Sequence, residues 1–134
     1  MREKILIIDD EKDFTHFVKE NLQLISNYTV VTASKGKKGI RAALKENPDL
    51  ILLDVTMPGI DGFEVLKRLK ENEKTYHIPV IMMTAESDDE FKLKASGFTA
   101  DDTIVKPVET KALREKIHNI LSPRRQSYAS IIKD

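Results

Sequence analysis

The stretch that decides the fold is residues 49–62, with the sequence DLILLDVTMPGIDG. Its four consecutive aliphatic residues, Leu50 to Leu53, leave no polar face for solvent, so they predict a strand that is buried on both faces, as in a parallel sheet. Asp54 ends this strand and a Met-Pro-Gly loop follows it. Open α/β sheets place their chemistry at the carboxyl ends of strands, although an isolated Asp there more often only begins a turn.

A second aliphatic run, Ile5 to Ile8, also lacks alternation and ends in the acidic pair Asp9-Asp10. It predicts another strand that is buried on both faces. Further strands are expected at residues 28–33, 79–83 and 103–105, of which the last two lead into Thr84 and Lys106-Pro107. Two buried strands therefore end in aspartate.

Apolar residues at helical spacing predict helices between these strands. The expected inward-facing residues are, helix by helix, Phe14, Phe17, Val18, Leu22 and Ile25; Gly36, Ile40, Ala43 and Leu44; Phe63, Leu66 and Leu69; Phe91, Leu93 and Ala95; and Leu113, Ile117, Ile120 and Leu121. The fourth helix is expected to begin near Ser87 and to stop at Gly97, and the last to run from Glu109 to Leu121.

Five strands alternating with five helices predict an α/β fold of the flavodoxin-like (βα)5 type. Such a fold is a three-layer sandwich in which helices cover both faces of a parallel five-stranded sheet of order 2-1-3-4-5. Its topological switch point lies between the first and third strands, which are the strands that end in Asp9-Asp10 and Asp54. Ser122-Pro123 is expected to stop the last helix, which leaves residues 122–134 as a tail or linker stub after a domain of residues 1–121.

Length and composition limit the function classes. The 134 residues suffice for one domain, and 22 Lys plus Arg balance 22 Asp plus Glu. Binding to nucleic acid or to a membrane surface through net charge is therefore not expected. The chain contains no cysteine, which excludes thiol chemistry and suits a reducing compartment. Its apolar runs are too short for a signal-peptide core or a membrane span, so we expect a cytoplasmic protein.

The predicted winding brings Asp9, Asp10 and Asp54 to one edge of the sheet, together with Thr84 and Lys106. Three carboxylates in one crevice repel one another unless a cation neutralises them. Mg²⁺ is the expected ion because it prefers oxygen ligands and uses few carboxylates beside phosphate oxygens, and Mn²⁺ is a possible substitute. One aspartate could then act as a nucleophile toward a phosphoryl group, while a lysine and a hydroxyl bind the phosphoryl oxygens.

The acidic pair after the first strand, the Asp54-x-x-Met57-Pro58-x-x-x-Gly62 loop, Thr84-Ala85 and Lys106-Pro107 together resemble the receiver domains of two-component response regulators. The resemblance covers about residues 3–121. Each motif alone has an ordinary structural explanation, such as a helix cap, a strand end or a solvated lysine. Their coincidence at one predicted edge favours the functional interpretation.

The resemblance implies that Asp54 accepts a phosphoryl group from a sensor histidine kinase or a phosphotransfer protein. It also implies that Asp9, Asp10, Asp54 and the Thr56 backbone carbonyl hold Mg²⁺. In the same way, Thr84 is implied to be the hydroxyl that reports phosphorylation and Lys106 the phosphoryl-binding cation, with a cis bond before Pro107. The implied output is a downstream protein target, reached by a monomer or by a phosphorylation-dependent dimer through the face from the fourth to the fifth helix.

One position departs from the family pattern. Receivers usually carry an aromatic residue three positions before the lysine, and Thr103 stands there in this chain. A threonine cannot bury a comparable ring, so we expect phosphorylation to shift this face less than in a typical member. Thr56 and Glu86 occupy positions that border the path of hydrolytic water in the family, and they are expected to tune the lifetime of the acyl phosphate.

Other function classes compete with that of a phosphorylation-dependent switch. An aspartyl-phosphate phosphatase of the haloacid-dehalogenase type needs a second aspartate two residues after the nucleophile, where this chain has Thr56. We expect no enzyme activity beyond self-catalysed phosphotransfer to Asp54 and autodephosphorylation at Asp54. A phosphate-independent pseudo-receiver that only binds partners is the remaining alternative. An FMN site is not expected, because the loop that would hold its phosphate is acidic.

Overall fold

The predicted parallel sheet is confirmed. The computed structural model describes residues 2–85, 97 and 99–133, and within these the side chains as far as residue 126. The described strands form one parallel sheet in the order β2-β1-β3-β4-β5. Their bounds are β1 (Lys4–Ile8), β2 (Thr29–Ala33), β3 (Leu50–Asp54), β4 (Val80–Thr84) and β5 (Asp102–Val105).

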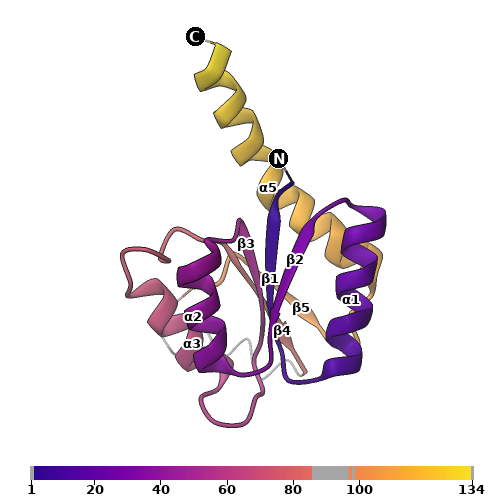
Figure 1. The fold of residues 1–134 in the computed structure, drawn as a ribbon, viewed down its shortest axis with the longest axis vertical. Helices are drawn as coiled ribbons and strands as arrows, with labels where there is room; N and C mark the ends of the chain where they lie inside the picture. Colours follow the sequence, from indigo (N-terminus) through magenta and orange to yellow (C-terminus); the bar gives the residue numbers. More distant parts are fainter. Residues whose placement is uncertain (1, 86–96, 98, 134) are drawn as a thin grey trace.

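Helices cover both faces of this sheet. The described helices are α1 (Lys12–Ile25), α2 (Gly36–Glu46), α3 (Gly62–Lys70) and α5 (Thr110–Lys133). Figure 1 shows α1 and α5 on one side of the sheet and α2 and α3 on the other. The helix expected between Ser87 and Gly97 falls on residues 86–96, which lie outside the described part of the chain.

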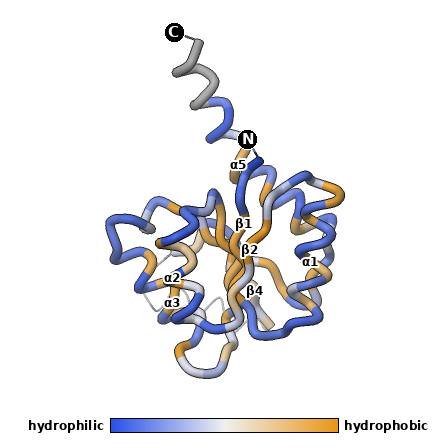
Figure 2. The backbone as a smooth tube through the Cα atoms, in the orientation of Figure 1, coloured by the Kyte–Doolittle hydropathy of each residue, from blue (hydrophilic) through white to orange (hydrophobic). Residues whose placement is uncertain are grey.

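Two separate cores explain why the strand sequences do not alternate. In β1, Ile5 and Ile7 pack in the core under α1 and α5, whereas Leu6 and Ile8 pack in the core under α2 and α3. A strand that buries both faces needs apolar residues at every position. Figure 2 shows the resulting apolar sheet at the centre of the molecule and polar segments outside it.

Small residues bring α2 close to the sheet. A Cβ atom at Gly39 would lie 2.5 Å from Ile8 Cδ1, and one at Gly36 would lie 2.6 Å from Ile60 Cγ1. The buried side of α2 is therefore Gly36, Gly39 and Ala43. The prediction that Leu44 faces inward is wrong, because Leu44 is next to Ala43 on the outer side and is 40% exposed.

Two expected core residues of α1 are also exposed. Val18 and Leu22 form the apolar part of the buried side of this helix. Phe17 adjoins Val18 but points away from the sheet and is 58% exposed, so its prediction as a core residue is wrong. Ile25 is the final residue of α1, beyond these buried contacts, and is likewise exposed.

Helix α5 does not end at Ser122-Pro123 as predicted, but continues to Lys133 with Pro123 inside it. Proline removes one backbone hydrogen bond, so the continuation needs other support. Arg125 supplies it, because its Nε lies 2.8 and 2.9 Å from the two carboxylate oxygens of Glu3 and its guanidinium also donates to Tyr28 Oη. These contacts tie the helix beyond the proline to the start of β1 and to the residue before β2.

Gly62 allows close packing at the other end of the sheet. A Cβ atom at this first residue of α3 would lie 2.3 Å from the Asp54 carbonyl oxygen and 2.7 Å from Val55 Cα. Both neighbours are backbone atoms, which cannot rotate away. The Asp54 loop can therefore fold against α3 only if this position lacks a side chain.

We expect Gly62→Ala to lower the free energy of unfolding by about 2 kcal/mol, because the added methyl group overpacks against the backbone of Asp54 and Val55. Urea denaturation measures this change. Gly59→Asn is the matched control, because Gly59 has open space around it and a φ of 81°, a conformation that Asn tolerates. Unchanged stability of the alanine variant would contradict the close-packing argument.

We expect Arg125→Ala to loosen α5 beyond Pro123, because it removes the contacts with Glu3 and Tyr28. Partly exposed pairs of this kind contribute about 1 kcal/mol, so amide hydrogen exchange in residues 124–133 should speed up roughly fivefold. Arg124→Ala is the control, since within the described part of the chain the Arg124 side chain donates one hydrogen bond, to the His77 carbonyl at 3.3 Å. Equal exchange rates in Arg125→Ala and the wild type would show that the clamp does not stabilise the helix.

Candidate functional site

The structure brings the three predicted aspartates together at the carboxyl edge of the sheet. Asp9 and Asp10 follow β1, Asp54 ends β3, and these adjacent strands pair in register through Ile8 and Leu53. One carboxylate oxygen from each aspartate lies within 4.8 Å of the others. Asp9 and Asp54 are buried, whereas Asp10 is exposed.

Lys106 enters the same cluster from β5. Its Nζ lies 3.0 Å from Asp9 Oδ2 and 3.4 Å from Asp54 Oδ1. The backbone fixes the position of this lysine, because its N–H donates to the Thr84 carbonyl at 2.7 Å and extends the β4–β5 pairing by one residue. The peptide bond between Lys106 and Pro107 is cis, as the resemblance implied.

Two further residues hold Lys106, and the sequence analysis missed both roles. Glu11 Oε1 lies 3.5 Å from Lys106 Nζ, and the Phe14 ring centroid lies 4.8 Å from the same nitrogen. Glu11 also donates its backbone N–H to Asp9 Oδ1 at 2.9 Å. The sequence signal for Glu11 was its place as the third consecutive acidic residue after β1, whereas Phe14 had been predicted only as a core residue.

The two threonines of the predicted site have different surroundings. Thr84 is buried, and its hydroxyl donates to the Ile104 carbonyl at 3.5 Å, the limit for a hydrogen bond. Thr56 is exposed, and its backbone N–H donates to Asp54 Oδ1 at 3.3 Å. Among the contacts of the described residues, Asp54 accepts a hydrogen bond from the Thr56 backbone N–H and lies against Lys106. Glu86 lies outside the described residues.

Burial and charge together perturb Asp54. Desolvation and the neighbouring Asp9 carboxylate raise the pKa of Asp54 to about 6, and Lys106 and the Thr56 N–H only partly offset them. Desolvation opposes the charged form of Lys106, but the hydrogen bond to Asp9 and the charges of Asp54, Asp9 and Glu11 outweigh it, so the pKa of Lys106 is raised. One ammonium group therefore does not fully compensate two buried carboxylates.

The donor set fits a hard divalent cation. Mg²⁺ prefers oxygen ligands, and the three carboxylates lie close enough to share one ion. Asp10 is exposed and leaves an open side through which an ion could enter with its water. The remaining charge imbalance at Asp9 and Asp54 is the property that such an ion would remove.

The raised pKa of Asp54 predicts a pH-dependent stability. The Asp54 carboxyl loses its proton near pH 4 in the unfolded chain and near pH 6 in the folded protein. Its contribution to the stability of the fold is therefore fully present below pH 4 and is lost as the pH rises through 6. Without divalent ions, Asp54→Asn should gain up to about 3 kcal/mol relative to the wild type between pH 4 and pH 7. Urea denaturation across this range measures the difference.

Thr84→Val serves as the control for this experiment, because it changes the site without removing an ionisable group. Its stability difference from the wild type should stay constant with pH. A pH-independent difference between Asp54→Asn and the wild type would contradict the raised pKa.

Comparisons with known proteins agree with this geometry. The sequence model described as "Response regulator receiver domain" matches residues 5–118. The chain is 36% identical over 130 residues to the alkaline phosphatase synthesis transcriptional regulatory protein PhoP of Bacillus subtilis (strain 168), covering 97% of this chain and 52% of the relative. It is 38% identical over 129 residues to the response regulator ArlR of Staphylococcus saprophyticus, covering 96% and 56%. The chain thus spans about half the length of these curated relatives.

Solved structures give the same result. The chemotaxis protein CheY4 of Vibrio cholerae superposes with a TM-score of 0.81 at 30% identity, covering 90% of this chain and all of that one. A putative response regulator from Chloroflexus aurantiacus superposes with a TM-score of 0.83 at 29% identity, covering 91% and 99%. The acidic cluster, its lysine and the sheet order thus coincide with a family match over most of the sequence, and the chain belongs to the receiver domain family of two-component response regulators.

Proposed function

We propose that this domain is a signalling switch that accepts a phosphoryl group on Asp54 from a sensor histidine kinase or a phosphotransfer protein. The observation that supports this most directly is the contact of one lysine with two buried carboxylates, one of which ends a central strand. Asp54 is the acceptor because it lies between Lys106 and the Thr56 N–H and its pKa of about 6 leaves it mostly ionised at pH 7. The site would be presented to a kinase in the cytoplasm.

The proposed reaction uses groups that already lie in place. A carboxylate oxygen of Asp54 attacks phosphorus, the P–N bond of a phosphohistidine breaks, and the imidazole leaves with the bonding electron pair and takes up a proton. The product is an acyl phosphate on Asp54. Lys106 would neutralise a phosphoryl oxygen, and the Thr84 hydroxyl would exchange its long contact with Ile104 for another phosphoryl oxygen.

We assign Mg²⁺ binding to Asp9, Asp10, Asp54 and the Thr56 backbone carbonyl, with Mn²⁺ as a substitute. When bound, the ion would supply positive charge against the carboxylates and the incoming phosphoryl oxygens. The chain's own contribution is to keep these oxygens close together and partly dehydrated.

The output would follow from a shift between two conformations that bind a protein target differently. Differences of about 1–3 kcal/mol are ordinary for such coupling. We assign the contact to the face that β5 and α5 share, where the target or a phosphorylation-dependent second copy would bind. Thr103 lies half-buried on β5, and the smaller side chain is expected to limit the shift at this face.

The experiment is intact mass measured after incubation with acetyl phosphate and Mg²⁺. We expect the wild type to gain one phosphoryl group and Asp54→Asn to gain none, because Asn lacks the nucleophilic oxygen. Lys106→Ala should be modified more slowly, since the phosphoryl charge then lacks its neutralising partner. Lys111→Ala, which removes an exposed lysine of α5 outside the site, is the matched control.

No modification of the wild type would contradict the switch and favour a pseudo-receiver. Many turnovers on a small phosphate ester, lost in Asp54→Asn, would instead show a phosphatase. Both outcomes overturn the proposed function without affecting the fold.

A further inference from the structure

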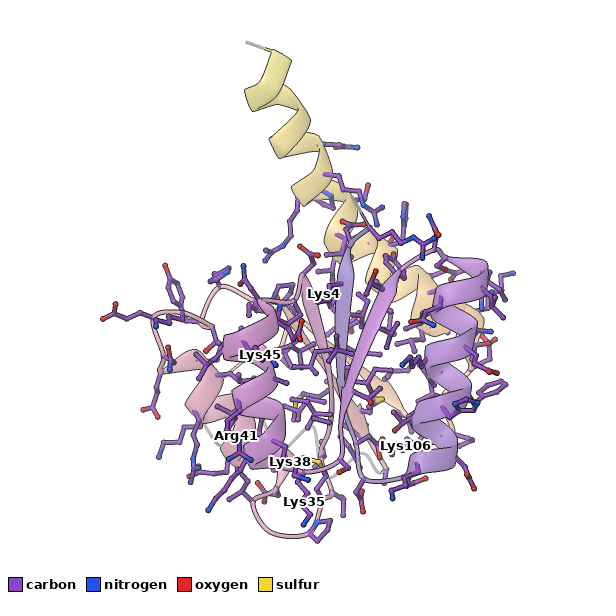
Figure 3. All side chains as sticks on the ribbon, viewed as in Figure 1. Lys4, Lys35, Lys38, Arg41, Lys45 and Lys106 are labelled. Atoms are coloured by element: carbon purple, nitrogen blue, oxygen red, sulfur yellow. The ribbon has the colours of Figure 1, made fainter. Side chains whose placement is uncertain are left out.

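Helix α2 carries an exposed row of positive charge. Its basic residues, which we call the α2 basic face, are Lys35, Lys37, Lys38, Arg41 and Lys45. All five are exposed, and Figure 3 shows four of them from the start of α2 at Lys35 to its last turn at Lys45. Within the described part of the chain, none of the five side chains takes part in a salt bridge or a side-chain hydrogen bond.

The acidic residue of α2, Glu46, interacts with Lys45 but compensates only a small part of this row, because its main charge partner is Lys4. Glu46 binds Lys4, whose Nζ lies 2.9 Å from Glu46 Oε2. The chain as a whole has no net charge, so positive charge is concentrated on α2 and balanced elsewhere. This uneven distribution is the feature that the receiver function does not explain.

The cations at the start of α2 lie where the helix dipole disfavours them, whereas Lys45 lies in the last turn, where the dipole favours a cation. Lys35 is the N-cap of α2 and makes no side-chain capping bond, and the first turn contains no acidic residue. Cations near a helix N-terminus oppose the helix dipole, and like charges three or four residues apart, such as Lys37 with Arg41 and Arg41 with Lys45, repel each other. Apart from the favourable position of Lys45 and its charge interaction with Glu46, no described contact of these side chains compensates for this, so the row indicates a function outside the domain's own stability.

Packing does not dictate the row either. The sheet requires only the small residues on the buried side, Gly36, Gly39 and Ala43, whose close contacts hold α2 rigidly against Ile8 and Ile60. The outer side is free to vary in composition. The exposed residues of α2 are nevertheless all cations apart from Leu44.

We propose that the α2 basic face, with Leu44 among its cations, docks an acidic helical segment of a partner protein. The cations from Lys35 to Lys45 span about 15 Å along a single helix, which matches one partner helix with acidic residues on successive turns. Leu44 provides an apolar contact of the kind that protein interfaces use beside charged rims. Duplex nucleic acid or a membrane surface fits less well, because the molecule is neutral overall and offers only one exposed apolar side chain on this helix.

A second copy of the chain offers no matching surface in the described helices. Helix α1 carries Lys12 and Lys19 beside Asp13 and Glu20, and α3 and α5 likewise mix both signs. The α2 basic face therefore has no complementary acidic row among the described helices of a second copy.

The test uses the unphosphorylated protein, so it does not depend on the chemistry at Asp54. A fluorescent synthetic helix with Glu on successive turns and one central Leu is titrated with the domain, and binding is followed by anisotropy at low and at moderate salt. We expect saturable, salt-sensitive binding that Lys37→Glu/Arg41→Glu/Lys45→Glu weakens at least about tenfold. Leu44→Gln should weaken it about fivefold, because an apolar contact is lost.

The matched control is Lys67→Glu/Lys74→Glu/Lys111→Glu, which makes the same change of net charge at exposed positions on other elements. This variant should bind as the wild type does. The neutral variant Lys37→Gln/Arg41→Gln/Lys45→Gln should melt at or above the wild-type temperature, because the removed charges repel one another. A lower melting temperature would assign these residues to the fold and overturn the proposal.

Three other outcomes would also overturn it. They are the absence of peptide binding, equal weakening by the two charge-reversal sets, and equally tight binding of duplex DNA or of phosphatidylserine vesicles through the same residues. The last outcome would replace the protein partner with a polyanion.

Discussion

The contact between the Lys106 ammonium and the buried carboxylates of Asp9 and Asp54 is the interaction on which the site depends. One positive charge stands against two negative charges in a poorly solvated crevice. Burial and the neighbouring Asp9 carboxylate together raise the pKa of Asp54 to about 6, and the imbalance of charge leaves a place for additional positive charge. The proposed binding of a divalent cation and the proposed phosphorylation of Asp54 both depend on it.

The sheet creates this imbalance. The interior residues of β1 and β3 are all apolar, because both faces of these strands are buried. Polar side chains can therefore stand only at the ends of the strands. Parallel pairing then brings several strand ends to the same edge. Gly62 lets α3 pack directly against the backbone of Asp54, which keeps the loop after Asp54 compact.

Charges of opposite sign gather on two different parts of the molecule. The carboxyl edge concentrates negative charge, whereas the outer side of α2 concentrates positive charge, part of it at the helix N-terminus, where the helix dipole disfavours cations. Gly36 contacts Ile60 in the loop after Asp54, so the helix that carries the cations also packs against this loop. A partner bound to α2 would thus lie close to Asp54.

The sequence by itself determined the strand order, the two-sided cores and the convergence of Asp9, Asp10 and Asp54, because buried parallel strands leave a strong apolar pattern and end at a common edge. Only the tertiary structure decided the exposure of Phe17 and Leu44, the continuation of α5 through Pro123, and the contacts of Glu11 and Phe14 with Lys106. The physical reason is that these features depend on residues distant in the chain. Helical spacing cannot distinguish a residue that faces the sheet from its neighbour at the edge of the buried side. Whether α5 continues through Pro123 depends on the positions of Glu3 and Tyr28, and the contacts of Lys106 depend on the position of β5.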